Sequence, residues 1–176
     1  MVRQAAESDV SEVVDYLCRN RSFHAPVDPI RADEYFTAEH WEKRIEYAIE
    51  DFNKGRYLEL FVFEINMPNR IIGKITFNNL VRGAFQACVV GYAMCESALR
   101  KGYMTEALGA AIKHMFDIEN YHRIMANYMP RNFASAALLN KLGFTLEGTA
   151  KDYLLIAGSW EDHILTSLTN PDWRPK

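Results

Sequence analysis

The chain has 176 residues, of which 49% are hydrophobic and 24% are charged. This length suggests one domain over residues 1–176, with enough apolar residues for a folded core. The net charge of −3 argues against direct DNA binding and against RNA binding through bulk charge, which usually accompanies a basic balance. Any contact with RNA or with a ribosome is therefore expected to be local.

The three cysteines, Cys18, Cys88 and Cys95, are an odd number without Cys-x-x-Cys spacing, which is typical of free thiols in a reducing compartment. The histidines show no zinc-ligand spacing with them, so no metal site is expected. No apolar run approaches the roughly 20 residues that cross a membrane, and the first residues lack a signal-peptide core. These features predict a cytoplasmic protein without membrane contact.

In chain order, apolar periodicity predicts a strand over residues 2–5, a helix over 9–19, a loop over 20–36, a helix over 41–52 and strands over 58–65, 71–77 and 85–94. Pro26 and Pro29 favour a loop over residues 20–36, and Gly55 ends the second helix. A turn is expected at residues 67–70. The three strands can form an antiparallel meander.

The second half of the chain continues with a helix over 102–119, a strand over 123–128, a helix over 132–142 and strands over 144–157 and 160–168. The first of these helices carries apolar residues at i, i+3, i+4 and i+7 spacing. Gly143 ends the second helix, and a turn at Gly158 and Ser159 separates the last two strands.

A candidate phosphate site lies at the start of the long helix, in the segment Leu99-Arg100-Lys101-Gly102-Tyr103. Unpaired backbone N–H groups and the positive end of the helix dipole attract anions there. Gly102 lets the backbone approach a phosphate, and Arg100 and Lys101 add positive charge. A glycine-containing loop with two solvated basic residues is the alternative, because short glycine motifs match many unrelated sequences.

A second candidate element follows about thirty residues later. Asn132, Ser135 and Leu139 share one helical face by their i, i+3, i+7 spacing. Asn132 can alternatively cap its own helix, and Ser135 can be a small residue at a helix contact. Neither residue alone decides between these interpretations.

Together these segments resemble the GNAT acetyltransferases, and within them the Rim group of ribosomal-protein-alanine N-acetyltransferases. The resemblance covers nearly the whole chain, and the residues that carry it lie within 81–88, 122–130, 142–148, 150–156, 158–163 and 171–173. It implies a single α+β (α/β) acyltransferase domain with a mixed, mostly antiparallel sheet. Two central strands, ending near Met94 and Tyr128, are expected to splay apart and form a wedge.

The resemblance also implies acetyl-CoA as co-substrate. Its pantetheine arm is expected to pair with backbone near Met94 and Cys95, and Asn132 to hold the pantetheine region. Ser135 is expected near the thioester sulfur. The residues expected to cradle the pyrophosphate are Arg100, Lys101, Gly102, Tyr103, Met104 and Thr105.

Four positions depart from the family pattern. Leu99 stands where the phosphate loop usually has Gln or Arg, and Met104 stands where it prefers Gly or Ala, so re-oriented or weaker phosphate contacts are expected. Asn127 replaces the Glu that serves a related ribosomal-protein acetyltransferase as base, and Leu139 replaces its Tyr acid. The base and acid roles of that enzyme therefore do not transfer to this chain.

The chemistry tolerates a weak base, because an N-terminal α-amine with a pKa of about 7.7–8.0 is already partly neutral at pH 7. Asp152 is the predicted carboxylate that holds a water for this step, although it can equally be a solvated surface residue. Ser135 is predicted to protonate the leaving thiolate, with the hydroxyls of Tyr92 and Tyr128 as the next candidates. Cys95 reads as a small buried residue, which favours direct attack by the amine.

The resulting hypothesis is direct acetylation of the N-terminal alanine of a ribosomal protein, with a ribosome contact and a monomeric or homodimeric state. Two alternatives stay open. A deep acidic pocket would favour a small amine such as a polyamine or aminoglycoside, whereas an open groove between the loop at 20–36 and the last hairpin would favour a peptide. Failure to bind acetyl-CoA would favour a non-catalytic ribosome-assembly module. His122 and His163 are expected to be structural.

Overall fold

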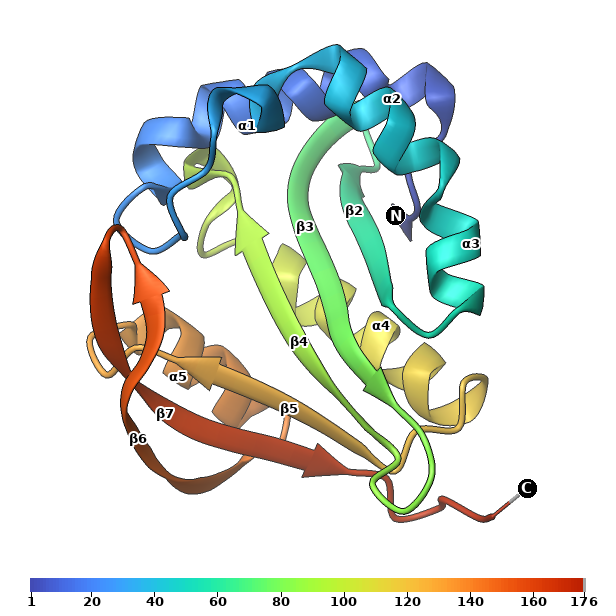
Figure 1. The fold of residues 1–176 in the computed structure, drawn as a ribbon, viewed down its shortest axis with the longest axis vertical. Coiled ribbons are helices and arrows are strands. Elements are labelled where there is room, and N and C mark those ends of the chain that lie inside the picture. Colours follow the sequence, from blue (N-terminus) through green and yellow to red (C-terminus); the bar gives the residue numbers. More distant parts are fainter. Residues whose placement is uncertain (176) are drawn as a thin grey trace.

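The computed structural model describes residues 1–175. Seven strands form one sheet in the order β1-β2-β3-β4-β5-β7-β6. The strands are β1 (Val2–Arg3), β2 (Tyr57–Glu64), β3 (Met67–Val81), β4 (Ala87–Met94), β5 (Arg123–Tyr128), β6 (Thr145–Ile156) and β7 (Ser159–Thr169). The helices are α1 (Val10–His24), α2 (Ala38–Glu46), α3 (Ala48–Asn53), α4 (Tyr103–Asp117) and α5 (Phe133–Lys141). Figure 1 shows α1, α2 and α3 on one side of the sheet and α4 and α5 on the other.

The sheet is mixed and mostly antiparallel, as the sequence predicts. Strands β2, β3 and β4 form the expected antiparallel meander, and β5, β7 and β6 pair antiparallel as well. Among the strand pairs of residues 1–175, only β4 and β5 run parallel. The predicted short strand near the start is also confirmed, because β1 pairs with β2.

The central pair of strands splays apart. Residues 87–89 of β4 pair with residues 123–125 of β5, whereas both strands continue for several residues beyond this short ladder. Figure 1 shows β4 and β5 diverging from the end at which they pair. The backbone edge of each strand is thereby left without a strand partner at the splayed end, as expected of the wedge.

Several predicted boundaries are wrong in the first half of the chain. Helix α1 continues to His24, so the start of the predicted loop at 20–36 is helical; no residue before Pro26 is a strong helix breaker. A 3-10 helix covers Asp33–Phe36 within the same segment. The single helix predicted over 41–52 is divided at Tyr47 into α2 and α3.

The turn predicted at residues 67–70 is also wrong. These residues belong to β3, and Met67 is opposite Glu64, so the chain reverses at residues 65 and 66. Pro68 fits there because the ladder between β2 and β3 skips the next residues, with Ile71 opposite Phe63. A proline without an N–H is tolerated in such an irregular stretch. The last hairpin reverses at Ala157 and Gly158, one residue earlier than predicted, with φ of 49° and 85°.

The core is continuous across both faces of the sheet. One face of α4 is buried through Leu108, Ala111 and Met115. Helix α2, which Figure 1 shows on the opposite side of the sheet, buries Trp41. In residues 1–175 no helix is long and apolar enough to cross a membrane.

Candidate functional site

The phosphate loop predicted at residues 100–105 meets the start of α4. Gly102 is the residue before the helix and has φ of 81°, a left-handed conformation that glycine adopts without strain. The first turn of the 15-residue helix consists of Tyr103, Met104 and Thr105, whose N–H groups precede any intrahelical acceptor. Arg100 also has a positive φ, of 61°. The loop therefore turns sharply into a helix start with free N–H groups, the geometry that favours anion binding.

The start of α5 lies against the splayed part of β4. The side-chain oxygen of Asn132 accepts a hydrogen bond of 3.0 Å from the Ser135 N–H, so Asn132 caps its helix. The Ser135 hydroxyl in turn lies 2.6 Å from the hydroxyl of Tyr92 on β4. This hydroxyl pair connects α5 with β4 beyond the point where β4 stops pairing with β5.

The Tyr92 hydroxyl remains protonated over the neutral pH range. Burial raises the pKa of Tyr92 to about 12, although the hydrogen bond with Ser135 lowers it in part. Both hydroxyls are therefore proton donors at neutral pH. Ser135 is itself buried, so a proton given up by one hydroxyl can be replaced by the other across a single hydrogen bond.

The end of β4 is fixed by α1 and β3. The Cys95 N–H donates to the carbonyl of Ile72 at 2.8 Å, so in the antiparallel ladder the backbone groups of Met94 point away from β3. The Met94 carbonyl accepts a 3.0 Å hydrogen bond from Nε2 of His24 on α1. The Met94 N–H is left facing the splayed side, whereas the Cys95 N–H is already engaged.

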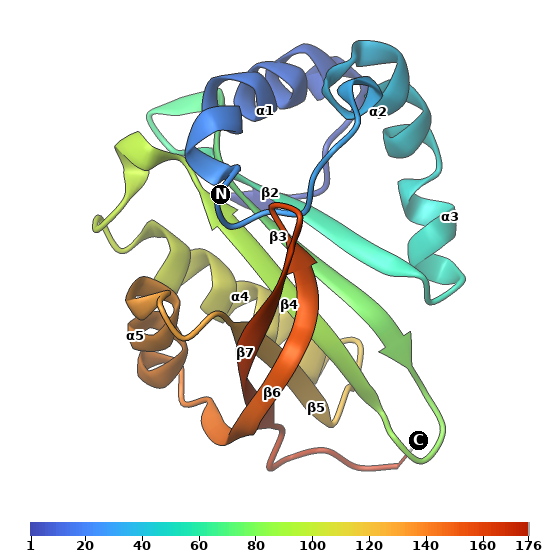
Figure 2. The ribbon, with the colours of Figure 1, turned by 60° about the vertical axis from the view of Figure 1, so that its left-hand side comes forward.

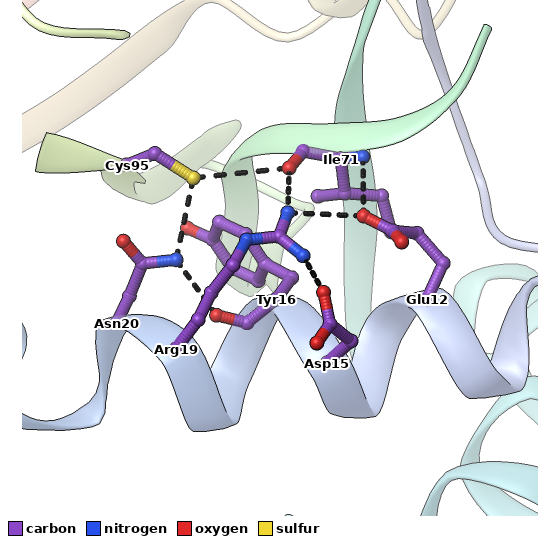
Figure 3. A network of polar contacts seen from close by, with 7 residues as sticks. All are labelled: Glu12, Asp15, Tyr16, Arg19, Asn20, Ile71 and Cys95. Atoms are coloured by element: carbon purple, nitrogen blue, oxygen red, sulfur yellow. Dashed lines mark hydrogen bonds and ion pairs between the residues drawn. The ribbon is translucent and has the colours of Figure 1, made fainter. Parts of the chain in front are cut away.

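A polar network holds α1 against the same strand ends (Figure 3). Glu12 accepts a 2.8 Å hydrogen bond from the Ile71 N–H and a 3.0 Å ion-pair contact from Arg19, and Arg19 also donates to the Ile71 carbonyl. Asn20 donates to the sulfur of Cys95 at 3.2 Å. The network fixes Cys95 as a buried structural thiol, as predicted.

The face of the sheet opposite α5 carries a second set of polar side chains. The side-chain amide of Asn127 donates to the Tyr153 hydroxyl at 3.2 Å, which links β5 to β6 across β7. The Tyr153 ring lies 5.5 Å, centroid to centroid, from the buried His163 ring on β7. Asn127, predicted as the position of a missing base, is thus joined to residues of the last hairpin.

Asp152 occupies a bulge in β6. The β6–β7 register shifts between Ala150 and Leu154, and Asp152 has φ of 46°. Its N–H donates to Asp162 at 3.0 Å, and its side chain is exposed. The structure therefore places Asp152 on the surface of the last hairpin, and its role with a catalytic water stays a prediction.

The tip of the β6–β7 hairpin touches the segment between α1 and α2. The Ala157 N–H donates to the Asp28 carbonyl at 3.0 Å, and Figures 1 and 2 both show the hairpin tip beside this segment. A Cβ on Gly158 would lie 3.4 Å from the side chain of Ile30. The two segments are therefore joined here rather than separated by a groove that is open along its whole length.

Some of these contacts cannot be predicted from the sequence. The sequence does suggest Tyr92 as an acid, because it lies on a predicted central strand, but its pairing with Ser135 depends on how α5 packs. The contact between His24 and Met94 was missed because residue 24 falls in a predicted loop. In residues 1–175 no cluster of three His, Cys, Asp or Glu side chains could hold a metal ion.

Comparison with known proteins agrees with this architecture. The model of the acetyltransferase (GNAT) domain family matches residues 1–145. The chain therefore belongs to the GNAT acetyltransferases, with the mixed sheet and splayed central strands described above, and is an acetyltransferase.

Particular relatives are similar over nearly the full length. The chain is 43% identical over 175 residues to the [ribosomal protein uS5]-alanine N-acetyltransferase of Escherichia coli K12, covering 99% of this chain and 90% of that protein. The structure of ribosomal-protein-S5-alanine acetyltransferase from Vibrio fischeri matches with a TM-score of 0.94 at 42% identity, covering 99% and 94% of the two chains. Mycobacterium smegmatis RimJ in complex with CoA-disulfide matches with a TM-score of 0.87 at 26% identity, covering 96% and 80%.

Proposed function

We propose that this chain transfers the acetyl group of acetyl-CoA to the α-amine of the N-terminal alanine of ribosomal protein uS5. The observation that carries the proposal is the 43% identity to a uS5-alanine N-acetyltransferase over 99% of the chain. Such an acceptor assigns the enzyme to the cytoplasm, with the N-terminus of the ribosomal protein as its partner.

The geometry around α4 and α5 supports acetyl-CoA as the donor. The free N–H groups of Tyr103, Met104 and Thr105, with the charges of Arg100 and Lys101, suit a pyrophosphate. The free Met94 N–H on the splayed edge of β4 suits an amide of the pantetheine arm. The amide nitrogen of Asn132 makes no hydrogen bond within residues 1–175, so it suits the same arm. With the pantetheine arm placed in this way, Ser135 would lie near the thioester sulfur.

Direct transfer fits these residues better than a covalent acetyl-enzyme. Cys95 is buried, accepts a hydrogen bond from Asn20 and approaches the Ile71 carbonyl at 3.7 Å. A thiolate there would face a carbonyl oxygen rather than a basic partner, which is unsuited to a nucleophile. The amine attacks the thioester carbonyl, and Ser135, backed by Tyr92, protonates the thiolate that leaves.

Acceptor selectivity tests the proposal. The purified enzyme is given acetyl-CoA with a peptide that starts with the N-terminal residues of uS5, with its N-blocked form carrying an internal lysine, and with a polyamine and an aminoglycoside. The free α-amine should react at least tenfold faster than the lysine amine, whose pKa near 10.4 demands about 3 kcal/mol more for deprotonation. Faster acetylation of the polyamine or aminoglycoside would overturn the proposal.

A further inference from the structure

We propose that His163 is the base that accepts the proton of the acceptor amine, an inference that rests on the proposed acetylation of an α-amine. The sequence alone predicts a structural role for this histidine. Three features point to the different role: the hydrogen bond of its ring, the face of the sheet on which it lies, and the pairing of the charges around it.

A single hydrogen bond of the His163 ring fixes its tautomer. Nδ1 lies 2.9 Å from the carbonyl oxygen of Glu161. A carbonyl only accepts, so Nδ1 carries the hydrogen, and Nε2 of the neutral ring holds the lone pair. A base held in one tautomer by a backbone carbonyl is ready to take up a proton at its other nitrogen.

Nε2 of His163 is not completely covered, although the residue as a whole is only 4% exposed. It makes no hydrogen bond within residues 1–175. The sealed polar side-chain atoms without a partner in that part of the chain are Gln4 Nε2, Tyr16 Oη and His40 Nε2. Nε2 of His163 does not belong to this set, so its surface is not completely sealed.

The position of His163 on β7 puts it opposite the coenzyme side of the sheet. Leu168 of the same strand faces α5, since its side chain lies 3.7 Å from where a Cβ on Gly143 would stand, directly after that helix. Side chains alternate along a regular strand. His163 is five residues before Leu168 on a strand without a register shift against β5, so it faces the other way.

The acid and the base thereby approach the splayed strands from opposite faces. Ser135 and Tyr92 meet on the α5 side, whereas His163 shares its face with Asn127, which is paired with Leu165 two residues along β7. Since Tyr128 is opposite Ile164, His163 lies level with the splayed end of β5. An amine that arrives from the His163 face would attack a thioester whose sulfur lies toward Ser135.

The charged groups near His163 are compensated by partners of their own. Glu161 is paired in two contacts with Arg131, at 2.5 and 2.8 Å, and Asp162 is paired with Lys151 at 2.6 Å. Toward His163, β5 contributes the neutral amide of Asn127, and β6 contributes the Tyr153 ring and the exposed Asp152. Within residues 1–175 the His163 ring therefore has no ion-pair partner of its own.

The transfer step balances with these groups. His163 Nε2 removes a proton from the attacking nitrogen as the C–N bond forms at the thioester carbonyl. The C–S bond breaks, its electron pair goes to the sulfur, and the thiolate takes a proton from Ser135, which regains one from Tyr92 or water. The proton on His163 passes to solvent. The net reaction turns a neutral amine and acetyl-CoA into an amide and CoA.

The test compares His163→Asn with His122→Asn. The Asn amide can still donate to the Glu161 carbonyl but cannot take up a proton near neutral pH. His122 is exposed, contacts Trp173 edge-to-face and directly precedes the end of β5 that pairs with β4, away from the splayed end, which makes it a matched control. Each variant is assayed with the alanine peptide for kcat/KM between pH 5.5 and pH 9, for acetyl-CoA affinity by calorimetry and for its unfolding midpoint.

His163→Asn should lower kcat/KM by about a hundredfold to ten-thousandfold. The acetyl-CoA affinities of His163→Asn and of His122→Asn should both stay unchanged. The pH profile should also change in shape. For the wild type the logarithm of kcat/KM should rise with a slope approaching two at acid pH, because the base and the amine must both be unprotonated for the reaction. The slope of the variant should not exceed one, and it should fall toward zero above the amine pKa of about 7.7–8.0.

A His163→Asn enzyme with a wild-type rate would overturn the inference, and so would a wild-type slope of one at low pH. The second measurement needs only the wild-type protein, so it holds even where the variant fails to fold. A wild-type enzyme inactive on the alanine peptide would instead contradict the proposed function itself. The two failures are therefore separable.

Discussion

Ser135 and Tyr92 are the two residues whose chemistry the structure changes most. From the sequence, Ser135 is a lone hydroxyl and Tyr92 a fallback acid. In the structure their hydroxyls lie 2.6 Å apart, and Tyr92 has a pKa of about 12 because it is buried. A serine backed by a protonated tyrosine can pass a proton to the thiolate and recover it without waiting for solvent.

Substitution of these two residues should therefore be non-additive. Ser135→Ala should lower kcat by about tenfold to a thousandfold with little change in acetyl-CoA affinity. Tyr92→Phe should lower kcat less. The double variant should be at most about threefold slower than Ser135→Ala, since the two residues act as a unit. Steady-state kinetics with chemistry shown to be rate-limiting measures this, with the exposed Ser22→Ala as control. An unchanged kcat in Ser135→Ala would remove the serine from the mechanism.

At the scale of single elements, the start of α4 is the part that the sequence predicts best. Its predicted first residue is one position early, and its predicted apolar face is the buried one. The helix is long and strongly amphipathic, so local periodicity suffices to place it. The turn predicted at residues 67–70 is wrong for the opposite reason, because pairing with β2 draws Pro68 into a strand despite its local preference.

The charge next to this helix start gives a further prediction. Arg100→Glu with Lys101→Glu should weaken acetyl-CoA binding by several kcal/mol at low salt, and by much less at high salt because salt screens exposed charges. Calorimetry at two ionic strengths measures this. The control applies the same charge change at exposed Lys43 and Arg56, on α2 and after α3. Equal affinity in the variant and the wild type would remove the loop from the coenzyme site.

For the whole molecule, a charged cluster joins the helical layer of α2 to the sheet. Glu59 of β2 is buried between Arg44 of α2, at 2.8 Å, and Lys74 of β3, at 3.5 Å. Burial alone would raise the pKa of Glu59, but the two cations outweigh it and hold the pKa below its usual value. Lys74 also donates to the Tyr35 hydroxyl at 2.9 Å, so the cluster reaches the segment before α2.

This cluster predicts a pH dependence of stability. Because the pKa of Glu59 is lowered on folding, its contribution is present above the unfolded value of about 4.3 and is lost as the pH falls through the folded value. Glu59→Gln leaves two cations uncompensated and should cost about 3–5 kcal/mol at pH 7. Urea unfolding from pH 7 to pH 3 should show a shallower acid loss in Glu59→Gln than in the wild type. Exposed Glu39→Gln should behave as the wild type, and equal acid slopes in all three would contradict the assignment.

The segments proposed to bind the coenzyme are predictable from the sequence, and those proposed to bind the acceptor are not. Loop residues 100–105 and the start of α5 are contiguous segments, so their pattern survives without the fold. The proposed acceptor side joins Asn127, Tyr153 and His163 from three strands, and Tyr153 lies in the stretch where the register of β6 shifts. No local pattern encodes that shift, which is why His163 looks structural in the sequence.

The most direct test of the account is the mass of the N-terminal peptide of uS5 in cells with and without this protein. In its presence the N-terminal alanine should carry an added acetyl group, and in its absence the α-amine should be free. Restoring the wild-type protein should restore the acetyl group, whereas Ser135→Ala should restore it slowly. An N-terminus equally acetylated in both strains, or free in both, would contradict the assignment of uS5 as the acceptor.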